Sequence, residues 1–316
     1  MSVFTPVQSS ELAQFLGQYR VGDLLDYSGI AEGIENTNFF VRTTTNRFVL
    51  TLFERTPAQD LPFFLSVMEH LAAAGLPSAA PVRRRDGQLL GQLNQRPAAL
   101  VARLPGSGVV VPTVAQVTQL GSVMGQMHLA LDDLPQSRLP DRGLDWMQAT
   151  AEQVAPVLDA SASQLLADEM RAQSHAAWSQ LPQGVIHADL FRDNALFDED
   201  RLTGLIDFYY ACNDAWVYDL AVSFNDWVLN AGHPATGPVG SAFLRAYQHA
   251  RPLTAQEREL WPLALRRAAL RFWLSRLQDW HFPRDGELTY RKDPMDFERL
   301  LRWHREHPVP LHGGES

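Results

Sequence analysis

Apolar and polar positions alternate in short segments through much of the first hundred residues, a pattern typical of half-buried strands. Three such segments cover residues 24–28, 38–42 and 47–53. They follow a stretch with apolar residues at helical spacing, which are Leu12, Phe15, Leu16 and Tyr19. The pattern therefore predicts one short helix followed by an antiparallel sheet.

A change of pattern marks the expected domain boundary. Residues 98–104 read as a buried strand, and the run Pro105-Gly106-Ser107-Gly108 breaks it. After Thr113, which can cap a helix, apolar residues recur at helical spacing, with Gly121 and Gly125 small enough for close packing. We therefore expect an α+β protein with a strand-rich domain of residues 1–104 and a mostly helical domain of residues 105–316.

Polar groups gather between apolar strands in the middle of the chain. Val185 and Ile186 run into a loop that holds His187, Asp189 and Asn194. Two further strands follow, residues 195–197 and 202–206, and the second ends at Asp207. If the two strands form an antiparallel hairpin, Asn194 and Asp207 meet at its open end.

Carboxylate and carboxamide oxygens of this kind are suited to Mg²⁺. The spacing His-x-Asp, then Asn five positions after the Asp, then a strand ending in Asp-Phe, matches the catalytic loop and metal site of kinase-like phosphotransferases. Taken singly, each of these residues is more often an ordinary turn residue. The three together at this spacing favour the catalytic interpretation.

Composition and charge narrow the function classes. The net charge of −9 argues against a nucleic-acid-binding surface, which needs a basic face. A single cysteine, Cys212, excludes an intrachain disulfide framework and fits a reducing compartment. The N-terminal stretch shows no signal-peptide pattern, and no apolar run approaches the roughly 18 residues of a membrane span. We expect a cytoplasmic protein.

Several segments together resemble the homoserine kinases of the aminoglycoside-phosphotransferase type, and they span nearly the whole chain. These segments are residues 29–40, 48–54, 187–194, 206–214, 269–277 and 292–294. The form His187-Ala188-Asp189, and Tyr209 after Asp207-Phe208, are similar to that branch rather than to protein kinases. The resemblance implies a two-lobed protein-kinase-like fold with a small strand-rich N-lobe and a larger, mostly helical C-lobe.

The resemblance also implies a reaction, the ATP-dependent phosphorylation of the L-homoserine hydroxyl to O-phospho-L-homoserine, on the way to threonine. Asp189 would accept the hydroxyl proton, and Asn194 and Asp207 would hold Mg²⁺ across the ATP phosphates. The implied partner is the small-molecule substrate, and the chain would act as a monomer or homodimer.

Further positions carry over from the resemblance. The first loop would lie over the ATP phosphates with Gly33, Asn36 and Asn38, and the strand end at Arg103 and Leu104 would meet the adenine. A zwitterionic amino acid also needs a cation and an acceptor. The available groups are Tyr210, Asp214, Trp227, Arg271 and Arg276. For either arginine, a structural ion pair is about as well supported as a substrate contact.

The chain departs from the general kinase-like pattern at a few positions. Thr51 stands where a phosphate-binding Lys is expected, and Phe64 is the best match for its Glu partner, with Glu69 the one acid in that helix. Arg55 is a candidate substitute for the missing cation. Arg192 stands where proline is expected after Phe191, which should affect loop stiffness more than chemistry.

Two alternatives stay open from the sequence. The first keeps the fold and changes the acceptor to an aminoglycoside, a choline-like alcohol or a sugar. An aminoglycoside site would favour many acids, whereas the loop after Asp207 is aromatic and neutral apart from Asp214 and Asp219. The second is a non-catalytic kinase-like binding module, which only Thr51 suggests.

Overall fold

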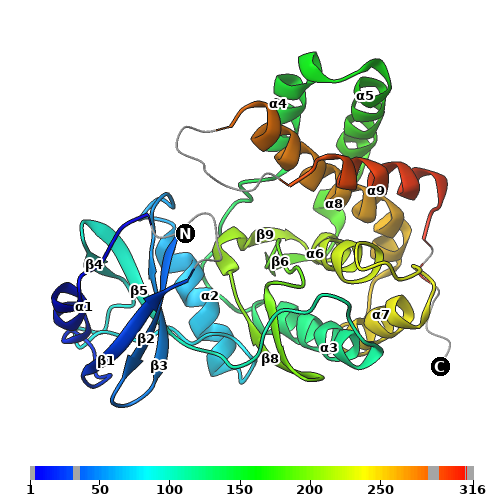
Figure 1. The fold of residues 1–316 in the computed structure, drawn as a ribbon. Coiled ribbons are helices and arrows are strands. Elements are labelled where there is room, and N and C mark those ends of the chain that lie inside the picture. The colour runs from blue at the N-terminus through cyan, green and yellow to red at the C-terminus, as the bar shows by residue number, and fades with distance from the viewer. Residues whose placement is uncertain (1–3, 31–35, 284–291, 310, 312–316) are drawn as a thin grey trace. The chain divides into compact units, whose positions relative to one another are not determined.

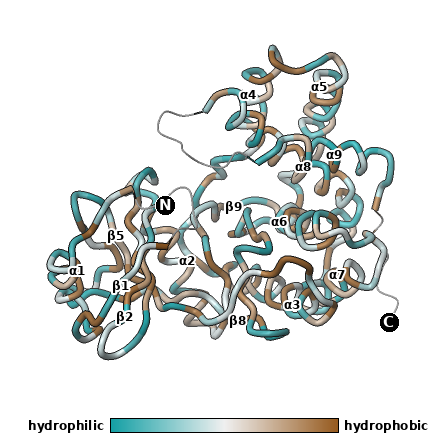
Figure 2. The backbone as a smooth tube through the Cα atoms, in the orientation of Figure 1, coloured by the Kyte–Doolittle hydropathy of each residue, from teal (hydrophilic) through white to brown (hydrophobic). Residues whose placement is uncertain are grey.

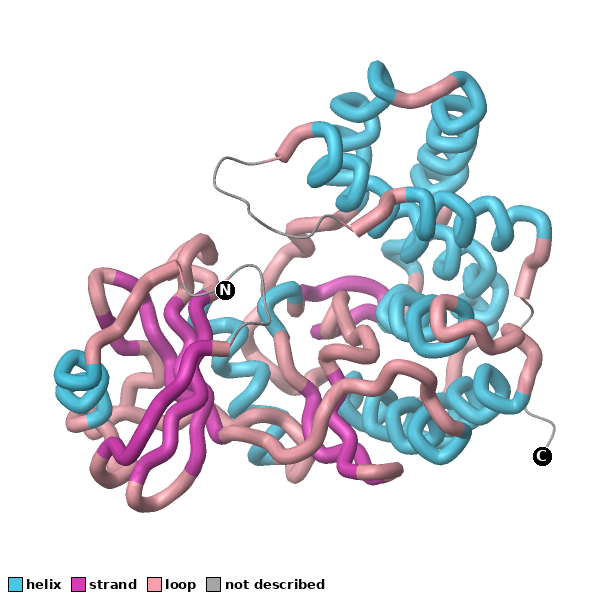
Figure 3. Tube along the Cα trace, viewed as in Figure 1, coloured by secondary structure: helices cyan, strands magenta, loops and turns pink. Residues whose placement is uncertain are grey.

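The computed structural model describes residues 4–30, 36–283, 292–309 and 311, and the chain divides into two compact units. The first unit is Met1–Gly106 with Thr203–Phe208, and the second is Ser107–Leu202 with Tyr209–Ser316. Most strands belong to the first unit and most helices to the second (Figure 3). The short segment Thr203–Phe208 thus groups with the first unit although it lies far along the chain.

The first unit is built on a five-stranded sheet in the order β1-β2-β3-β5-β4, with antiparallel neighbours throughout (Figure 1). Its strands are β1 (Leu24–Gly29), β2 (Thr37–Thr43), β3 (Arg47–Leu52), β4 (Gly91–Leu93) and β5 (Arg96–Ala102). The alternation read from the sequence therefore predicted the first three strands to within about a residue at each end.

One helix lies on each side of this sheet, α1 (Ser9–Leu16) and α2 (Leu61–Ala73) (Figure 1). Leu12 and Phe15 of α1 join Phe48 and Leu50 of β3 in one buried apolar cluster. The strands are accordingly apolar along much of their length, whereas the turns between them are hydrophilic (Figure 2). Burial of this apolar face is what holds α1 on the sheet, because an eight-residue helix is not stable alone.

The second unit is mainly helical. Its α-helices are α3 (Val114–Ala130), α4 (Leu144–Val154), α5 (Ala160–His175), α6 (Trp216–Phe224), α7 (Pro238–Ala250), α8 (Ala255–His281) and α9 (Met295–Glu306). Short turns of other helix types are η1 (Ala155–Val157), η2 (Trp178–Gln180), η3 (Phe208–Tyr210) and η4 (Asn225–Leu229). None of the helices in the described residues is long and apolar enough to cross a membrane.

Packing of the helices follows the sequence signals closely in two places. Thr113 caps α3 by accepting the backbone N–H of Gln116 at 3.2 Å, as expected. Gly121 of α3 faces the α7 backbone so closely that an added Cβ would lie 2.4 Å from the Phe243 carbonyl oxygen. Gly121 therefore permits the close approach of α3 and α7.

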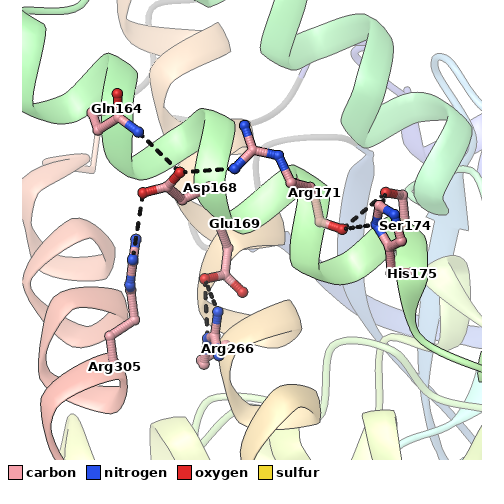
Figure 4. Close-up of polar contacts among 8 residues, drawn as sticks. All are labelled: Gln164, Asp168, Glu169, Arg171, Ser174, His175, Arg266 and Arg305. Atoms are coloured by element: carbon pink, nitrogen blue, oxygen red, sulfur yellow. Dashed lines mark hydrogen bonds and ion pairs between the residues drawn. The ribbon is translucent and has the colours of Figure 1, made fainter.

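Helix α5 is tied to its neighbours by charged groups (Figure 4). Glu169, which is fully buried, accepts from Arg266 of α8 at 2.6 Å. Asp168 lies 3.6 Å from Arg305 of α9. The buried pair orients α5 on α8, whereas the partly exposed pair contributes little, because solvent screens it.

Four strands, β6 (Gln183–Ile186), β7 (Ala195–Asp198), β8 (Arg201–Leu205) and β9 (Cys212–Ala215), form two small sheets. β7 and β8 make the expected hairpin. β6 pairs antiparallel with β9, so that Ile186 lies opposite Cys212. The expectation that the aromatic segment after Asp207 is a loop was wrong in part, since the chain forms β9 there and α6 begins at Trp216.

Candidate active site

The loop from His187 to Asn194 connects β6 to β7 in the second unit. At its start Ala188 has φ of 64°, in the left-handed region that residues with a Cβ rarely adopt. Asp219 of α6 supports this conformation, because its carboxylate accepts the backbone N–H groups of His187 at 3.0 Å and Ala188 at 2.7 Å. The carboxylate thus fixes the backbone immediately before Asp189.

Asp219 is fully buried and has a third partner, Nε2 of His128 in α3, at 3.0 Å. Burial by itself disfavours the charged carboxylate, yet the hydrogen bonds from His128 and from the loop backbone hold the Asp219 pKa below its ordinary value. Burial also lowers the pKa of His128, whose Nδ1 lies 2.8 Å from the Tyr247 hydroxyl. The imidazole is therefore neutral at neutral pH, and its two hydrogen bonds connect Asp219 to Tyr247.

Asp189 and Asn194 lie side by side in the loop. The Asn194 side-chain amide donates to the Asp189 carbonyl at 2.8 Å and approaches its carboxylate oxygen Oδ2 at 3.4 Å. The backbone N–H of Phe191 donates to the same carbonyl at 2.8 Å. Because the nitrogen of the Asn194 amide is engaged in this way, its oxygen is left to bind another group. Asp189 is partly exposed.

Two further donors hold the loop from below. The indole N–H of Trp227 and the hydroxyl of Ser223 both donate to the carbonyl of Leu190, at 3.0 and 3.2 Å. Trp227 has no exposed surface, so it lies under the loop and is not open to a substrate in this structure. Trp227 therefore supports the His187–Asn194 loop.

Arg192 replaces the expected proline and is clamped by Asp226. Its backbone N–H donates to Asp226 Oδ2 at 2.9 Å, and its Nε donates to the same oxygen at 3.0 Å. A proline would lack that backbone donor. The stiffness that a proline ring provides is here supplied by a partly buried ion pair.

The supporting role of these residues was not predicted from the sequence, although their spacing indicates it. Asp219, Ser223, Asp226 and Trp227 recur at i, i+4, i+7 and i+8, which is one helical face. They lie on α6 and on η4, a π-helical continuation of it. Polar groups on one face of an otherwise apolar helix indicate buried hydrogen-bond partners, and this pattern would have identified them.

Asp207 lies two residues after the end of β8, and its φ of 64° places it, like Ala188, in the left-handed region. It groups with the first unit, whereas Asp189 and Asn194 belong to the second. No group of three His, Cys, Asp or Glu side chains suited to a metal occurs within the described parts of the chain. Taken separately, the Asn194 amide oxygen of the second unit and the Asp207 carboxylate of the first are hard oxygen ligands of the kind that Mg²⁺ prefers.

The candidate nucleotide contacts in the first unit are only partly described, since Gly33 lies outside the described residues. Asn36 is buried, and its Oδ1 has no hydrogen-bond partner among the described residues. Asn38 is opposite Thr51 in the β2–β3 pair, and the Thr51 hydroxyl donates to its Oδ1 at 2.7 Å. Asn38 therefore keeps its NH₂ group for another partner.

At the strand end proposed for adenine contacts, one backbone donor is already engaged. The backbone N–H of Arg103 already donates to the carbonyl of Arg47 at 3.1 Å, and its guanidinium lies 4.0 Å from the Phe40 ring. This leaves the Arg103 carbonyl and the Leu104 backbone as candidate adenine partners. Leu104 packs against Gly204, where a Cβ would come within 2.5 Å of its side chain.

The helix that follows β3 lacks the acid expected to pair with a phosphate-binding lysine. Phe64 is completely buried in α2. Glu69, the one acid of this helix, accepts a hydrogen bond from Arg83 at 2.7 Å on the surface. The positions expected for the lysine and its glutamate partner are thus occupied by two buried uncharged residues, Thr51 and Phe64. Loss of both charges together is consistent with the cost of burying one of them unpaired.

Three of the five candidate substrate residues come together in one small pocket. Tyr210, Asp214 and Arg271 line it with Ala188, the residue before Asp189. Arg276 is not among its lining residues, and it donates to Asp296 at 2.9 Å and to the Asp293 carbonyl at 2.7 Å. The pocket therefore joins the catalytic loop to α8 through Arg271.

Comparison with known proteins yields one family and a consistent set of relatives. Residues 26–261 match the phosphotransferase enzyme family. The chain is 48% identical to the homoserine kinase of Methylobacillus flagellatus over 302 residues, which cover 96% of this chain and 95% of that protein. It is 43% identical to the homoserine kinase of Neisseria meningitidis serogroup B, over 95% of this chain and 99% of that protein.

Solved structures agree on the fold at low sequence identity. An amicoumacin kinase in complex with AMP-PNP and Ca²⁺ matches with a TM-score of 0.73 and 14% identity, covering 96% of this chain and 95% of that one. A microcompartment-associated aminopropanol kinase matches with a TM-score of 0.63 and 15% identity, covering 94% of both. These neighbours confirm the kinase-like fold that the sequence predicted.

Proposed function

Because this chain belongs to the phosphotransferase enzyme family and is a small-molecule kinase, we propose that it phosphorylates the hydroxyl of L-homoserine with ATP, giving O-phospho-L-homoserine. The observation that carries this proposal is the near-complete alignment with homoserine kinases at 43% identity or more. The loop supported by Asp219 would contribute the proton acceptor, Asp189, and a metal ligand, Asn194, which have kinase-like spacing in the sequence.

In the proposed reaction Asp189 orients the substrate hydroxyl and accepts its proton. Asp189 is partly exposed near the start of a loop whose backbone is held by hydrogen bonds, so a substrate can reach it. The transition state of phosphoryl transfer is loose, and positioning of the hydroxyl therefore contributes more than the basicity of the acceptor. The hydrogen bonds to the loop backbone serve that positioning.

Mg²⁺, when bound with ATP, would neutralise charge on the transferring phosphate. Asn194 would contribute its amide oxygen, because the amide nitrogen is held by Asp189. Asp207 would contribute its carboxylate. The Asn36 and Asn38 side chains and the backbone at Arg103 and Leu104 are the groups of the first unit that we assign to the nucleotide.

The first test is a coupled assay of ADP release with Mg-ATP and a panel of alcohols. The panel contains L-homoserine, L-serine, L-threonine, choline, an aminoglycoside and a simple sugar. We expect efficient turnover of L-homoserine alone. Turnover of another alcohol instead would support the assignment as a kinase and contradict the assignment of L-homoserine as its substrate.

A pair of matched variants tests the role of Asp189. D189N keeps the size of the side chain and removes its basicity, and we expect a fall in kcat of about 10²–10⁴-fold with nearly unchanged nucleotide affinity. D193N makes the same change at an exposed position in the same loop. We expect D193N to retain kcat within about twofold, because exposed substitutions rarely disturb the fold. Equal kcat values for D189N and the wild type would remove Asp189 from the proposed role.

A further inference from the structure

The charged residues that line the pocket beside the His187–Asn194 loop are not paired with one another. Among the residues that line it are two acids, Asp141 and Asp214, and two arginines, Arg142 and Arg271. Asp214 is paired with Arg267, whose two terminal nitrogens donate to it at 3.0 and 2.7 Å. Asp141 is paired with Arg138 at 2.8 and 2.7 Å. Both acids are therefore neutralised by arginines that do not line the pocket.

Arg271 differs from these arginines. It is 5% exposed, and within the described part of the chain it has no ion pair with a carboxylate. Its guanidinium carbon lies 5.2 Å from the centre of the Tyr210 ring and 3.8 Å from that of Phe272. The aromatic rings stabilise the cation and restrict its plane, but they leave its N–H donors for another group.

A nearly buried cation without a counter-ion is costly, so its presence calls for a purpose. The planar guanidinium donates two parallel hydrogen bonds to a carboxylate, and such pairs are the strong and geometrically specific ones. The pocket also contains Ala188, which directly precedes the residue that we assign to the substrate hydroxyl. One substrate molecule could therefore place its anionic group at Arg271 and its hydroxyl at Asp189.

We infer that Arg271 binds the α-carboxylate of the acceptor and makes the enzyme selective for alcohols that carry one. This inference rests on the proposed function. It adds the residue that recognises the substrate and the charged group of the substrate that this residue binds. Arg142 is the weaker candidate, because it is more exposed, lies over the Trp146 ring at 4.4 Å and contacts Gln278 at 3.4 Å.

The substrate side of the inference is tested with the wild-type enzyme and two analogues of L-homoserine. One analogue, 4-hydroxybutyrate, lacks the amino group. The other, 3-aminopropan-1-ol (aminopropanol), lacks the carboxylate. We expect kcat/KM for aminopropanol to be lower than that for L-homoserine by at least about 100-fold, since a buried charged donor is left unpaired. Equal kcat/KM values for aminopropanol and L-homoserine would overturn the inference.

The protein side is tested with R271Q, R271K and the control R245Q. We expect R271Q to raise the KM for L-homoserine about 100-fold and to leave kcat/KM for aminopropanol within about threefold. R271K retains the charge without the planar fork, so an intermediate rise of about tenfold is expected. R245Q removes the same charge from an exposed position of α7 and should change neither value.

Binding of L-homoserine by calorimetry, without ATP, separates recognition from turnover, and circular dichroism verifies the fold of each variant. If the wild type turns over L-homoserine and R271Q has an unchanged KM, the inference fails alone. If R142Q rather than R271Q loses the dependence on the carboxylate, the assignment to Arg271 also fails. If the wild type does not accept L-homoserine at all, the proposed function fails first.

Discussion

The Asp219 carboxylate accepts the backbone N–H of Ala188 at 2.7 Å, across 31 positions of sequence. This bond holds a left-handed residue immediately before Asp189. The same carboxylate accepts from His187 and from His128, so three separate chain segments are joined at one buried group. Formation of the His187–Asn194 loop is therefore coupled to the packing of α3 and α6.

Removal of this carboxylate should cost both stability and activity. We expect D219A to lower the free energy of unfolding by about 3–5 kcal/mol, because it leaves two backbone donors and His128 without their buried partner. D219N retains one acceptor oxygen and should lose less stability, with kcat reduced by more than about tenfold through misplacement of Asp189. Urea denaturation and the ADP-release assay measure the two effects. The exposed control D132A should stay within about 0.5 kcal/mol of the wild type.

The ion pair of Arg192 and Asp226 should show measurable coupling. In a double-mutant cycle with R192A and D226A we expect an interaction free energy of about 1–3 kcal/mol, since the pair is partly buried and has two hydrogen bonds. The exposed pair Arg201–Asp198 should give less than about 0.5 kcal/mol in the same cycle. Similar coupling for the two pairs would show that burial does not strengthen the loop clamp.

His304 should make the protein less stable in acid. Burial, with a smaller effect of Arg266, lowers its pKa to about 3, and Nε2 lies 2.8 Å from the Asn225 amide oxygen. The unfolded chain binds a proton below about pH 6.5 that the folded chain does not bind until about pH 3. The free energy of unfolding should therefore fall as the pH drops through this window, by up to about 1.4 kcal/mol per pH unit.

The variant H304Q isolates that contribution. Glutamine cannot take up a proton, and its NH₂ group can still donate to Asn225. We expect the pH dependence of the free energy of unfolding between about pH 6.5 and 4 to become flatter by close to one proton. Parallel curves for H304Q and the wild type, measured by urea denaturation at each pH, would exclude His304 as the source.

Close packing of α3 on α7 should be sensitive to a single methyl group. G121A places a Cβ against the Phe243 carbonyl and the Tyr247 backbone nitrogen, at 2.4 and 3.1 Å in the present arrangement. We expect a loss of about 1–3 kcal/mol in the free energy of unfolding, because backbone atoms cannot move aside cheaply. G17A is the control, since its nearest neighbour lies at 3.3 Å and its backbone is right-handed. Equal melting temperatures for G121A and the wild type would contradict the packing argument.

Local signals predicted much of the fold. Alternation of apolar and polar residues predicted β1, β2 and β3, and the hydrogen-bonding Thr113 predicted the start of α3. The spacing of Asp189 and Asn194 predicted a loop between two strands, which is present. These features depend on residues a few positions apart, and their geometry follows from backbone periodicity and side-chain spacing.

Other features have no local signature. β9 was missed because its four residues, Cys212–Ala215, have no strand-like alternation and form a strand through pairing with β6. Arg271 and Arg276 are equivalent candidates by sequence, yet one pairs with Asp296 and the other lies between aromatic rings in the pocket. Which arginine keeps its donors for a ligand depends on neighbours that folding brings from distant parts of the chain.

The sequence by itself determined β1 to β3, the kinase-like family and the presence of a loop with Asp189 and Asn194 between two strands. Only the tertiary structure decided what holds that loop, through Asp219, Asp226 and Trp227, and which cation lines the pocket beside it. The physical reason is that a buried charge or polar group is stable only with its partners, and those partners are chosen by packing rather than by proximity in sequence.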